Sequence, residues 1–245
     1  MKSSIIFTAL LAMTKSANAL STPNSSTTVV TGEASTLIPG EVNVQQAFAK
    51  SSFPIAPDDL IHRAKEILSP QISIGTKDGG ECLADDFEFV AAVVGPIGKE
   101  EYLSALDTFK LTDSFDIEPN HFGFTVDPLQ TNRVWYFSRS IAKHIAPFMG
   151  AQPEKTKDDG VLTLPPQLFH MDFNEDGLVR EVGFYTVDRR QGNTGGLGGA
   201  FGYFWGVGKP LPIPECQPYK PSFRFRMLNL LGRIGKKFSK KKTSN

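Results

Sequence analysis

Apolar residues follow first a helical and then a strand period between residues 58 and 190. Residues 58–69 carry apolar side chains at helical spacing, after two aspartates and before Pro70, which predicts a helix. Residues 83–94 alternate between apolar and polar positions, which predicts a strand. Residues 99–110 return to the helical period, with Glu100 and Glu101 in the first turn, where carboxylates complement the helix dipole. The segment therefore opens with a helix, a strand and a second helix.

Further strands are predicted at 121–127, 133–139, 167–173 and 178–188. The last two are joined by Asn174-Glu175-Asp176-Gly177, which is typical of a turn closed by a glycine in the left-handed region. We expect this loop to place Asp172 opposite Arg180, because a shorter loop would set Asp172 against Glu181, and like charges would face each other. Helices followed by an antiparallel meander indicate an α+β fold.

The order of elements in residues 83–106, LADDFEFVAAVVGPIGKEEYLSAL, resembles the central signature of the nuclear transport factor 2-like superfamily, which includes the SnoaL-like proteins and the steroid isomerases. The resemblance implies a bent antiparallel sheet wrapped around helices, a cone-shaped apolar pocket and often a homodimer. It covers about half of the chain, as one domain over residues 58–190. This fold hosts enzymes and ligand binders alike, so it assigns no reaction by itself.

The same resemblance allows a comparison with the ketosteroid isomerases. Ala84-Asp85-Asp86 matches the motif before their catalytic base, which puts the base position at Ala91. Their oxyanion-binding aspartate falls at Phe169, and the first predicted helix contains no tyrosine. An isomerase needs a carboxylate to move the proton and buried donors to stabilise the dienolate. The sequence therefore excludes isomerase chemistry of that kind.

Three residues are candidates for other catalysis. His170 and Asp172 lie two residues apart on a predicted strand, so their side chains share one face. They fit a general base with an orienting carboxylate in the pocket, but apolar residues at 169, 171 and 173 favour an outward polar stripe instead. His121, on another predicted strand, is the third candidate.

Four more residues are candidates for ligand binding: Trp135, Arg139, Tyr185 and Asp86. The simpler interpretation of Asp86 is a solvated cap of the strand. Two functions remain open. The first is a protein that binds a small apolar molecule in its pocket and associates with itself. The alternative is a SnoaL-like enzyme, a cyclase, isomerase or dehydratase, that uses a histidine with Asp172. Neither function requires a cofactor.

Metal binding is not indicated. Asp172, Asn174, Asp176 and Gly177 match the opening of a calcium-binding EF-hand loop, but Gly183 stands where the twelfth position must be glutamate. The sequence has no CxxC or HxxxH pair for zinc. The two cysteines, at 82 and 216, are far apart, and we expect both to be free.

Two segments precede the predicted domain. Residues 1–19 combine a lysine, a short apolar run and Ala17-Asn18-Ala19, which is typical of a secretory signal peptide. Residues 20–57 are rich in Ser, Thr and Pro, which indicates a disordered linker or a second targeting segment. Leu20 directly after the cleavage site resembles the bipartite leaders of algae with complex plastids. We therefore expect the secretory pathway, with the plastid as one destination.

Residues 191–219 are rich in glycine and proline, and residues 191–208 contain eight glycines among aromatic residues. This pattern favours a flexible loop that covers the pocket with its aromatic side chains. A small glycine zipper with four-residue spacing is the other interpretation.

Charge is unevenly distributed. Nine of the 26 basic residues and no acidic residue follow Gln217. Two more basic residues lie in the leader, which leaves 15 against 26 acidic residues, a net of −11, in residues 20–219. An acidic body argues against nucleic-acid binding. Residues 220–245 mix basic and large apolar residues, so they form either an amphipathic helix that contacts an anionic membrane surface or a solvated extension.

Overall fold

The computed structural model describes residues 37–242, so the expected signal peptide and part of the expected second targeting segment lie outside the described residues. The helices are α1 (Val44–Ala49), α2 (Pro57–Ile67), α3 (Lys99–Phe109), α4 (Leu111–Ser114), α5 (Gly199–Gly206) and α6 (Phe223–Lys242), with short 3-10 turns at Pro153–Lys155, Asp158–Gly160 and Pro214–Cys216. The strands are β1 (Leu83–Ala91), β2 (Val94–Gly98), β3 (Phe115–Glu118), β4 (His121–Val126), β5 (Arg133–Ser138), β6 (Ile141–His144), β7 (Val161–Thr163), β8 (Gln167–Phe173) and β9 (Val179–Thr186).

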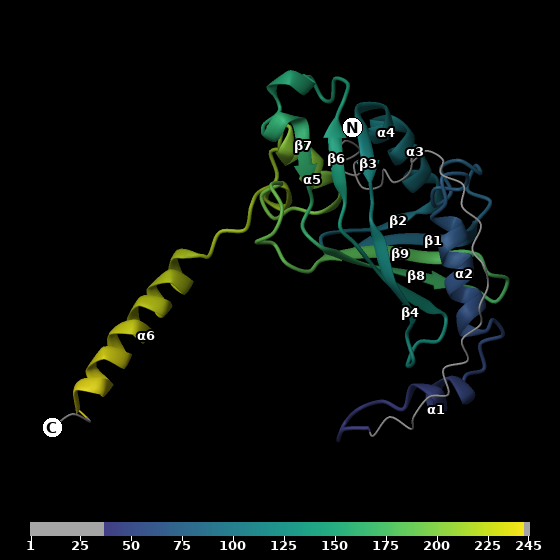
Figure 1. The fold of residues 1–245 in the computed structure, drawn as a ribbon, viewed down its shortest axis with the longest axis horizontal. Helices are drawn as coiled ribbons and strands as arrows, with labels where there is room; N and C mark the ends of the chain where they lie inside the picture. Colours follow the sequence, from purple (N-terminus) through teal and green to yellow (C-terminus); the bar gives the residue numbers. More distant parts are fainter. Residues whose placement is uncertain (1–36, 243–245) are drawn as a thin grey trace, which may run out of the picture.

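Six strands form the main sheet in the order β2-β1-β9-β8-β5-β4. The pairings are antiparallel except for β1 and β9, which run parallel. Helix α2 packs on β4 and β5, and α3 packs on β1 and β2 (Figure 1). The expected α+β class, a bent and largely antiparallel sheet with helices against it, is confirmed.

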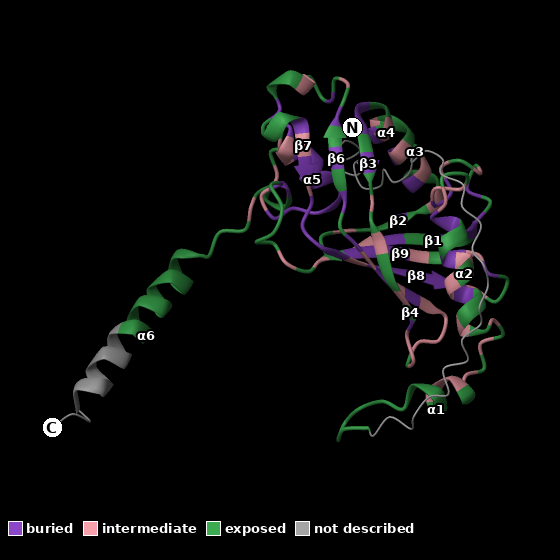
Figure 2. Ribbon diagram, in the orientation of Figure 1, coloured by how far each residue is buried: buried purple, intermediate pink, exposed green. Residues whose placement is uncertain are grey.

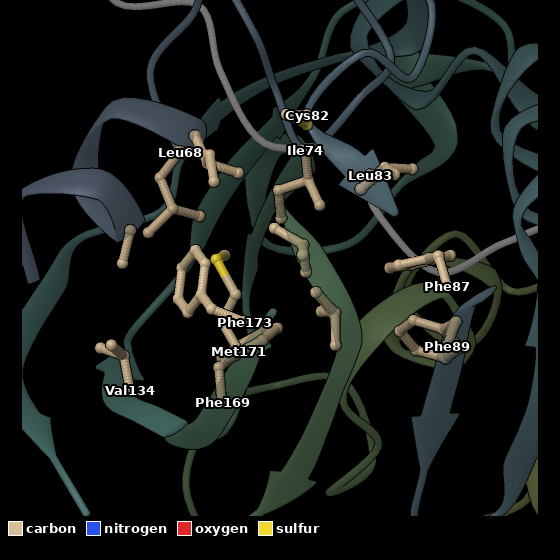
Figure 3. Packing of buried hydrophobic residues seen from close by; sticks show 14 of the residues in the cluster. Leu68, Ile74, Cys82, Leu83, Phe87, Phe89, Val134, Phe169, Met171 and Phe173 are labelled. Carbon is tan, nitrogen blue, oxygen red and sulfur yellow. The ribbon is translucent and has the colours of Figure 1, made fainter. Parts of the chain in front are cut away.

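Helix α2 forms where the sequence predicted it. Pro57 supplies the first turn, two aspartates follow, and three apolar residues on one face are fully buried. They pack in a first core against the inner face of the sheet, together with Phe169, Met171 and Phe173 of β8 (Figure 3). Residues 44–49 form α1, and Phe48, Phe53 and Ile55 pack against this core. Residues 48–55 are therefore attached to the folded body, whereas residues 37–46 are exposed.

A second core lies beside the first. Strands β3, β6 and β7 form a three-stranded sheet that the sequence analysis did not predict. Helix α5 packs on it, with Phe201 and Phe204 5% and 0% exposed (Figure 2). The glycine-rich segment was expected to be a flexible cover. The structure differs here, because Gly199–Gly206 is a buried helix and its aromatic side chains supply much of this core.

The hairpin between β8 and β9 corrects the expected register. Gly177 has φ +74° and closes the predicted turn, and Phe173 lies opposite Val179. A bulge then follows, so Asp172 lies opposite Glu181 and not opposite Arg180. The expectation that like charges would avoid each other was wrong, because a third strand supplies a cation between them.

Candidate functional site

A cavity of about 270 Å³ opens between the β1–β2 turn, the end of β9 and α5. Pro214 to Lys220 closes its remaining side. Its floor is apolar and comes from Ala91, Val94, Phe184, Leu197 and Phe201. An apolar floor with few polar groups is the usual character of a site for a small organic molecule.

The inner wall of the cavity lies next to the side-chain amide of Gln167, which has no hydrogen-bond partner among the described residues. Thr186 and Gly198 line the cavity, and a Cβ atom added to Gly198 would lie 2.7 Å from Thr186 Oγ1 and 2.9 Å from Gln167 Nε2. Gln167 is 1% exposed, and neither its Nε2 nor its Oε1 has a hydrogen-bond partner among residues 37–242. An unpaired buried polar group costs about 1–3 kcal/mol. Gln167 is not itself among the residues that line the cavity, so its amide makes the wall behind Thr186 and Gly198 polar without opening into the cavity.

The mouth of the cavity is charged. The titratable residues that line it are Arg189, Glu215, Tyr219 and Lys220, and all four are exposed. Ala91, the position to which the resemblance assigns the catalytic base, also lines the cavity, but as an apolar contact. The charged residues of the cavity thus lie at its entrance, and none of the described lining residues is a buried acid or base.

His121 lies on the inner face of the sheet. It is opposite Ser138 in the β4–β5 ladder, and its ring meets Tyr136 edge to face with centroids 5.2 Å apart. Both ring nitrogens are buried and have no hydrogen-bond partner in the described part of the chain. Burial lowers the pKa of His121 from 6.5 to about 4. The ring is therefore neutral at neutral pH, and it is not among the residues that line the cavity.

His170 and Asp172 lie on the opposite, outer face of the sheet, because they alternate with the three β8 residues of the first core. His170 is fully buried, and its Nε2 lies 2.8 Å from Glu181 Oε1. Burial lowers the pKa of His170, although the hydrogen bond to Glu181 opposes this change. Gly183 allows the ring to lie flat, because a Cβ there would be 2.4 Å from His170 Cε1. His170 is thus paired with Glu181, not with Asp172.

Arg133 of β5 holds the two carboxylates of this outer face together. Its Nε and Nη2 donate to Asp172 Oδ1 and Oδ2 at 2.5 and 2.7 Å, and its Nη2 lies 3.2 Å from Glu181 Oε1. The hydrogen bonds to Asp172 raise the pKa of Arg133. Gln130 adds a hydrogen bond of 2.7 Å to Asp172 Oδ2. With its acceptor oxygens occupied in this way, Asp172 supports the sheet and does not orient a base.

The four candidate ligand-binding residues lie away from the cavity. The rings of Trp135 and Tyr185 flank His170 on the outer face, with centroids 5.5 and 5.8 Å from it. Asp86 Oδ2 accepts a hydrogen bond from Arg180 Nε at 2.9 Å and lies 2.7 Å from Arg180 Nη2, in an exposed ion pair. Arg139 is exposed between β5 and β6. None of these four residues lines the cavity.

One sequence signal did point toward the cavity. The glycine-rich segment was expected near a pocket, and Leu197, Gly198 and Phe201 from it form part of the lining. The β1–β2 turn gave no such signal, since Ala91–Val94 is a plain apolar run. Pro214 to Tyr219 was expected only as part of a glycine- and proline-rich extension, and Lys220 as part of the basic tail.

The described residues contain no cluster that could bind a metal ion, and both cysteines are buried. Across residues 37–242, no group of three or more His, Cys, Asp or Glu side chains is placed to hold a metal ion. Asn174 Oδ1 accepts hydrogen bonds from two backbone amides of its own turn, at 3.1 and 2.8 Å. Cys82 and Cys216 are free and buried in separate cores, and burial raises the pKa of both thiols, that of Cys82 to about 12.

No protein-family model matches this chain, and no curated protein does. Similar solved structures include a putative polyketide cyclase from Xanthomonas campestris, with 17% identity and a TM-score of 0.38 over 51% of this chain and 91% of that one. A putative SnoaL-like polyketide cyclase from Jannaschia has 14% identity and a TM-score of 0.38, over 56% and 88%. An LEH-like epoxide hydrolase from M. tuberculosis has 10% identity and a TM-score of 0.36, over 54% and 84%. At these values the likenesses carry no argument about function, which must come from the cavity itself.

Proposed function

We propose that this protein is a SnoaL-like domain protein that binds a small, largely apolar molecule in the cavity between the β1–β2 turn and α5. One observation carries the proposal: an apolar cavity of about 270 Å³ whose inner wall lies against the buried, unpaired amide of Gln167. The floor favours an apolar body, and the unpaired amide of Gln167, which lies behind Gly198 and is not itself a lining residue, gives this wall a polar character that suits a polar end of the ligand.

The charges at the mouth refine the ligand class. Arg189 and Lys220 bring two cations to the entrance, and Glu215 brings one carboxylate. An anionic or strongly polar group on the ligand would remain at this entrance, because the floor offers it no counter-charge. The ligand is therefore an amphiphile whose apolar body enters the cavity.

A reaction is not part of the proposal. The alternative enzyme needs a histidine and Asp172 facing one substrate. His121 lies on the inner face of the sheet, opposite to Asp172. His170 shares the outer face with Asp172, but it is hydrogen-bonded to Glu181, and neither residue lines the cavity. Asp172 is engaged by Arg133. No observation favours catalysis over binding.

Fluorescence titration with anilinonaphthalene sulfonate tests the proposal, because this probe joins an apolar ring system to an anionic group. Arg189→Glu should weaken binding of the probe about five- to tenfold, the effect of one opposed charge near a surface. Arg139→Glu is the matched control, since Arg139 is also exposed but lies outside the cavity, and this variant should bind the probe as the wild type does. Ala92→Trp, in the exposed turn at the mouth, should reduce binding further by filling space.

Equal affinity for the wild type and the Arg189→Glu and Ala92→Trp variants would refute the proposal. Weaker binding of the probe by the Arg139→Glu variant alone would instead place the ligand site at the residues that the sequence suggested. All variants keep the same C-terminal helix, so any probe bound there contributes equally to each titration.

Self-association and entry into the secretory pathway stay predictions. Phe122 and Tyr185 are 47% and 37% exposed on the outer face of the sheet, and Phe122 stacks on Phe137 with centroids 5.5 Å apart. If two copies meet at this face, Phe122→Lys should convert a dimer into a monomer, as measured by light scattering after gel filtration. An unchanged mass for that variant would exclude this face as the contact.

A further inference from the structure

Helix α6 extends away from the rest of the molecule (Figure 1). It begins at Phe223, with Ser222 Oγ accepting a hydrogen bond from the Phe225 amide at 3.2 Å. Every side chain from Phe223 to Arg233 is exposed (Figure 2). Six large apolar side chains in this stretch are 47% to 69% exposed: Phe223, Phe225, Met227, Leu228, Leu230 and Leu231. So many exposed apolar side chains on one helix mark an interaction surface.

The spacing of these residues gathers most of them on one side. Met227, Leu230 and Leu231 lie four, seven and eight residues after Phe223. The four side chains therefore share one face of the helix. Arg226 and Arg233 are seven residues apart and border one edge of this face. Phe225 lies on the other side of the helix. This apolar face, residues 223, 227, 230 and 231, is therefore bordered by positive charge.

The charge of the tail identifies what covers the apolar face. Nine basic residues and no acidic residue follow Gln217, whereas residues 20–219 carry a net of −11. A second copy of the helix would bring like charges together. A nucleic acid would pair with the cations but would leave the apolar face in water. An anionic lipid surface satisfies both, because phospholipid head groups attract the cations and the boundary with the acyl chains takes the apolar face.

None of the helices among residues 37–242 is long and apolar enough to span a membrane. The first turn of α6 begins at Phe223, three residues after Lys220, which lines the cavity together with Pro218 and Tyr219. A helix bound to a surface would therefore begin at the mouth of the cavity.

We propose that α6 is an interfacial helix that binds the protein to anionic membrane surfaces through its apolar face and its basic border. The proposal is independent of the ligand site, because α6 does not line the cavity.

Sedimentation with vesicles tests it on the full chain. One set of vesicles contains phosphatidylcholine alone, and the other contains phosphatidylcholine and phosphatidylserine in equal parts. Each basic residue near an anionic surface contributes about 1 kcal/mol, or about fivefold in affinity, so Arg226→Gln with Arg233→Gln should weaken binding to the anionic vesicles about 30-fold. Leu230→Gln with Leu231→Gln should weaken it about 100-fold, because each leucine loses roughly tenfold from lost burial.

Phe225→Gln is the matched control, because it makes the same kind of change on the other side of the same helix, and it should bind nearly as the wild type does. Thermal unfolding of each variant should match the wild type, since these side chains contact no core. All variants share the same N-terminal residues, so the differences report α6.

Several results would overturn the proposal: no wild-type binding to anionic vesicles, equal binding to both kinds of vesicle, or unchanged binding of the leucine or arginine variants. Binding of wild-type protein to an RNA or DNA oligonucleotide, without binding to vesicles, would assign the helix to nucleic acid instead.

Discussion

Replacing Arg133 with methionine should destabilise the sheet strongly. Methionine keeps the length and the apolar stem of arginine but removes the cation that joins Asp172 of β8 to Glu181 of β9. These carboxylates are direct neighbours in the ladder. Without Arg133, two like charges would face each other on strands that must pair.

The magnitude follows from the burial of the pair. The side chains of Arg133 and Asp172 are 18% and 10% exposed. Removal of one partner from a buried ion pair costs about 3–5 kcal/mol, and the residual exposure places this pair near 3 kcal/mol. For a chain of this length, that loss lowers the midpoint of thermal unfolding, Tm, by roughly 6–12 °C.

Thermal unfolding followed by circular dichroism measures the effect. Arg190→Met is the matched control, because the Arg190 side chain is 89% exposed in its pair with Asp188, and its Tm should not change. Adding Asp172→Asn and Glu181→Gln to the Arg133 variant should restore most of the lost stability, since no charge is then left unpaired. A single Arg133→Met variant that melts with the wild type, or a triple variant that melts lower still, would refute this account of the register.

Two further predictions concern stability. The pKa of His121 is about 4 in the folded protein and 6.5 in the unfolded chain. The unfolded chain therefore binds a proton at a higher pH than the folded protein does, and the free energy of unfolding falls as the pH drops from 6.5 towards 4. His121→Gln should remove up to about 3 kcal/mol of that fall, as measured by urea unfolding across this range, and an unchanged pH profile would contradict the buried, neutral ring. A chain stopped after Arg190 loses Phe201 and Phe204 from the second core, and each deleted phenylalanine removes about 3–5 kcal/mol. It should no longer unfold cooperatively, whereas a chain stopped after Lys220 should melt as the full chain does. Equal melting of the two truncated chains would disprove the second core.

The sequence predicted those elements whose stabilisation is local. Helices α2 and α3 carry their own first-turn carboxylates, and β8 has regular alternation, so their positions follow from period and capping. Helix α5 could not be predicted in this way. Its glycines disfavour a helix, and it forms because Phe201 and Phe204 are buried against β3, β6 and β7. Strand β7 has only three residues, too few to show a period.

The register and the cavity depend on contacts between distant parts of the chain. The bulge that sets Asp172 opposite Glu181 is compatible with their charges only because Arg133 lies some forty residues earlier on a neighbouring strand. The lining of the cavity joins residues 91–94, the end of β9 and residues 196–220. Residues 91–94 lie within the 83–106 signature and the glycine-rich segment was expected near a pocket, but neither pattern indicates that these segments meet, so only the folded chain reveals it.

The central claim is that the cavity beside α5 holds a small amphiphile, and a crystal structure of the full chain grown with anilinonaphthalene sulfonate tests it most directly. The account predicts density for the ring system against Leu197 and Phe201, with the sulfonate near Arg189 or Lys220. Density at the outer face beside Trp135 and Tyr185 instead, or a turn at 91–94 packed onto α5 with no space for the probe, would contradict it.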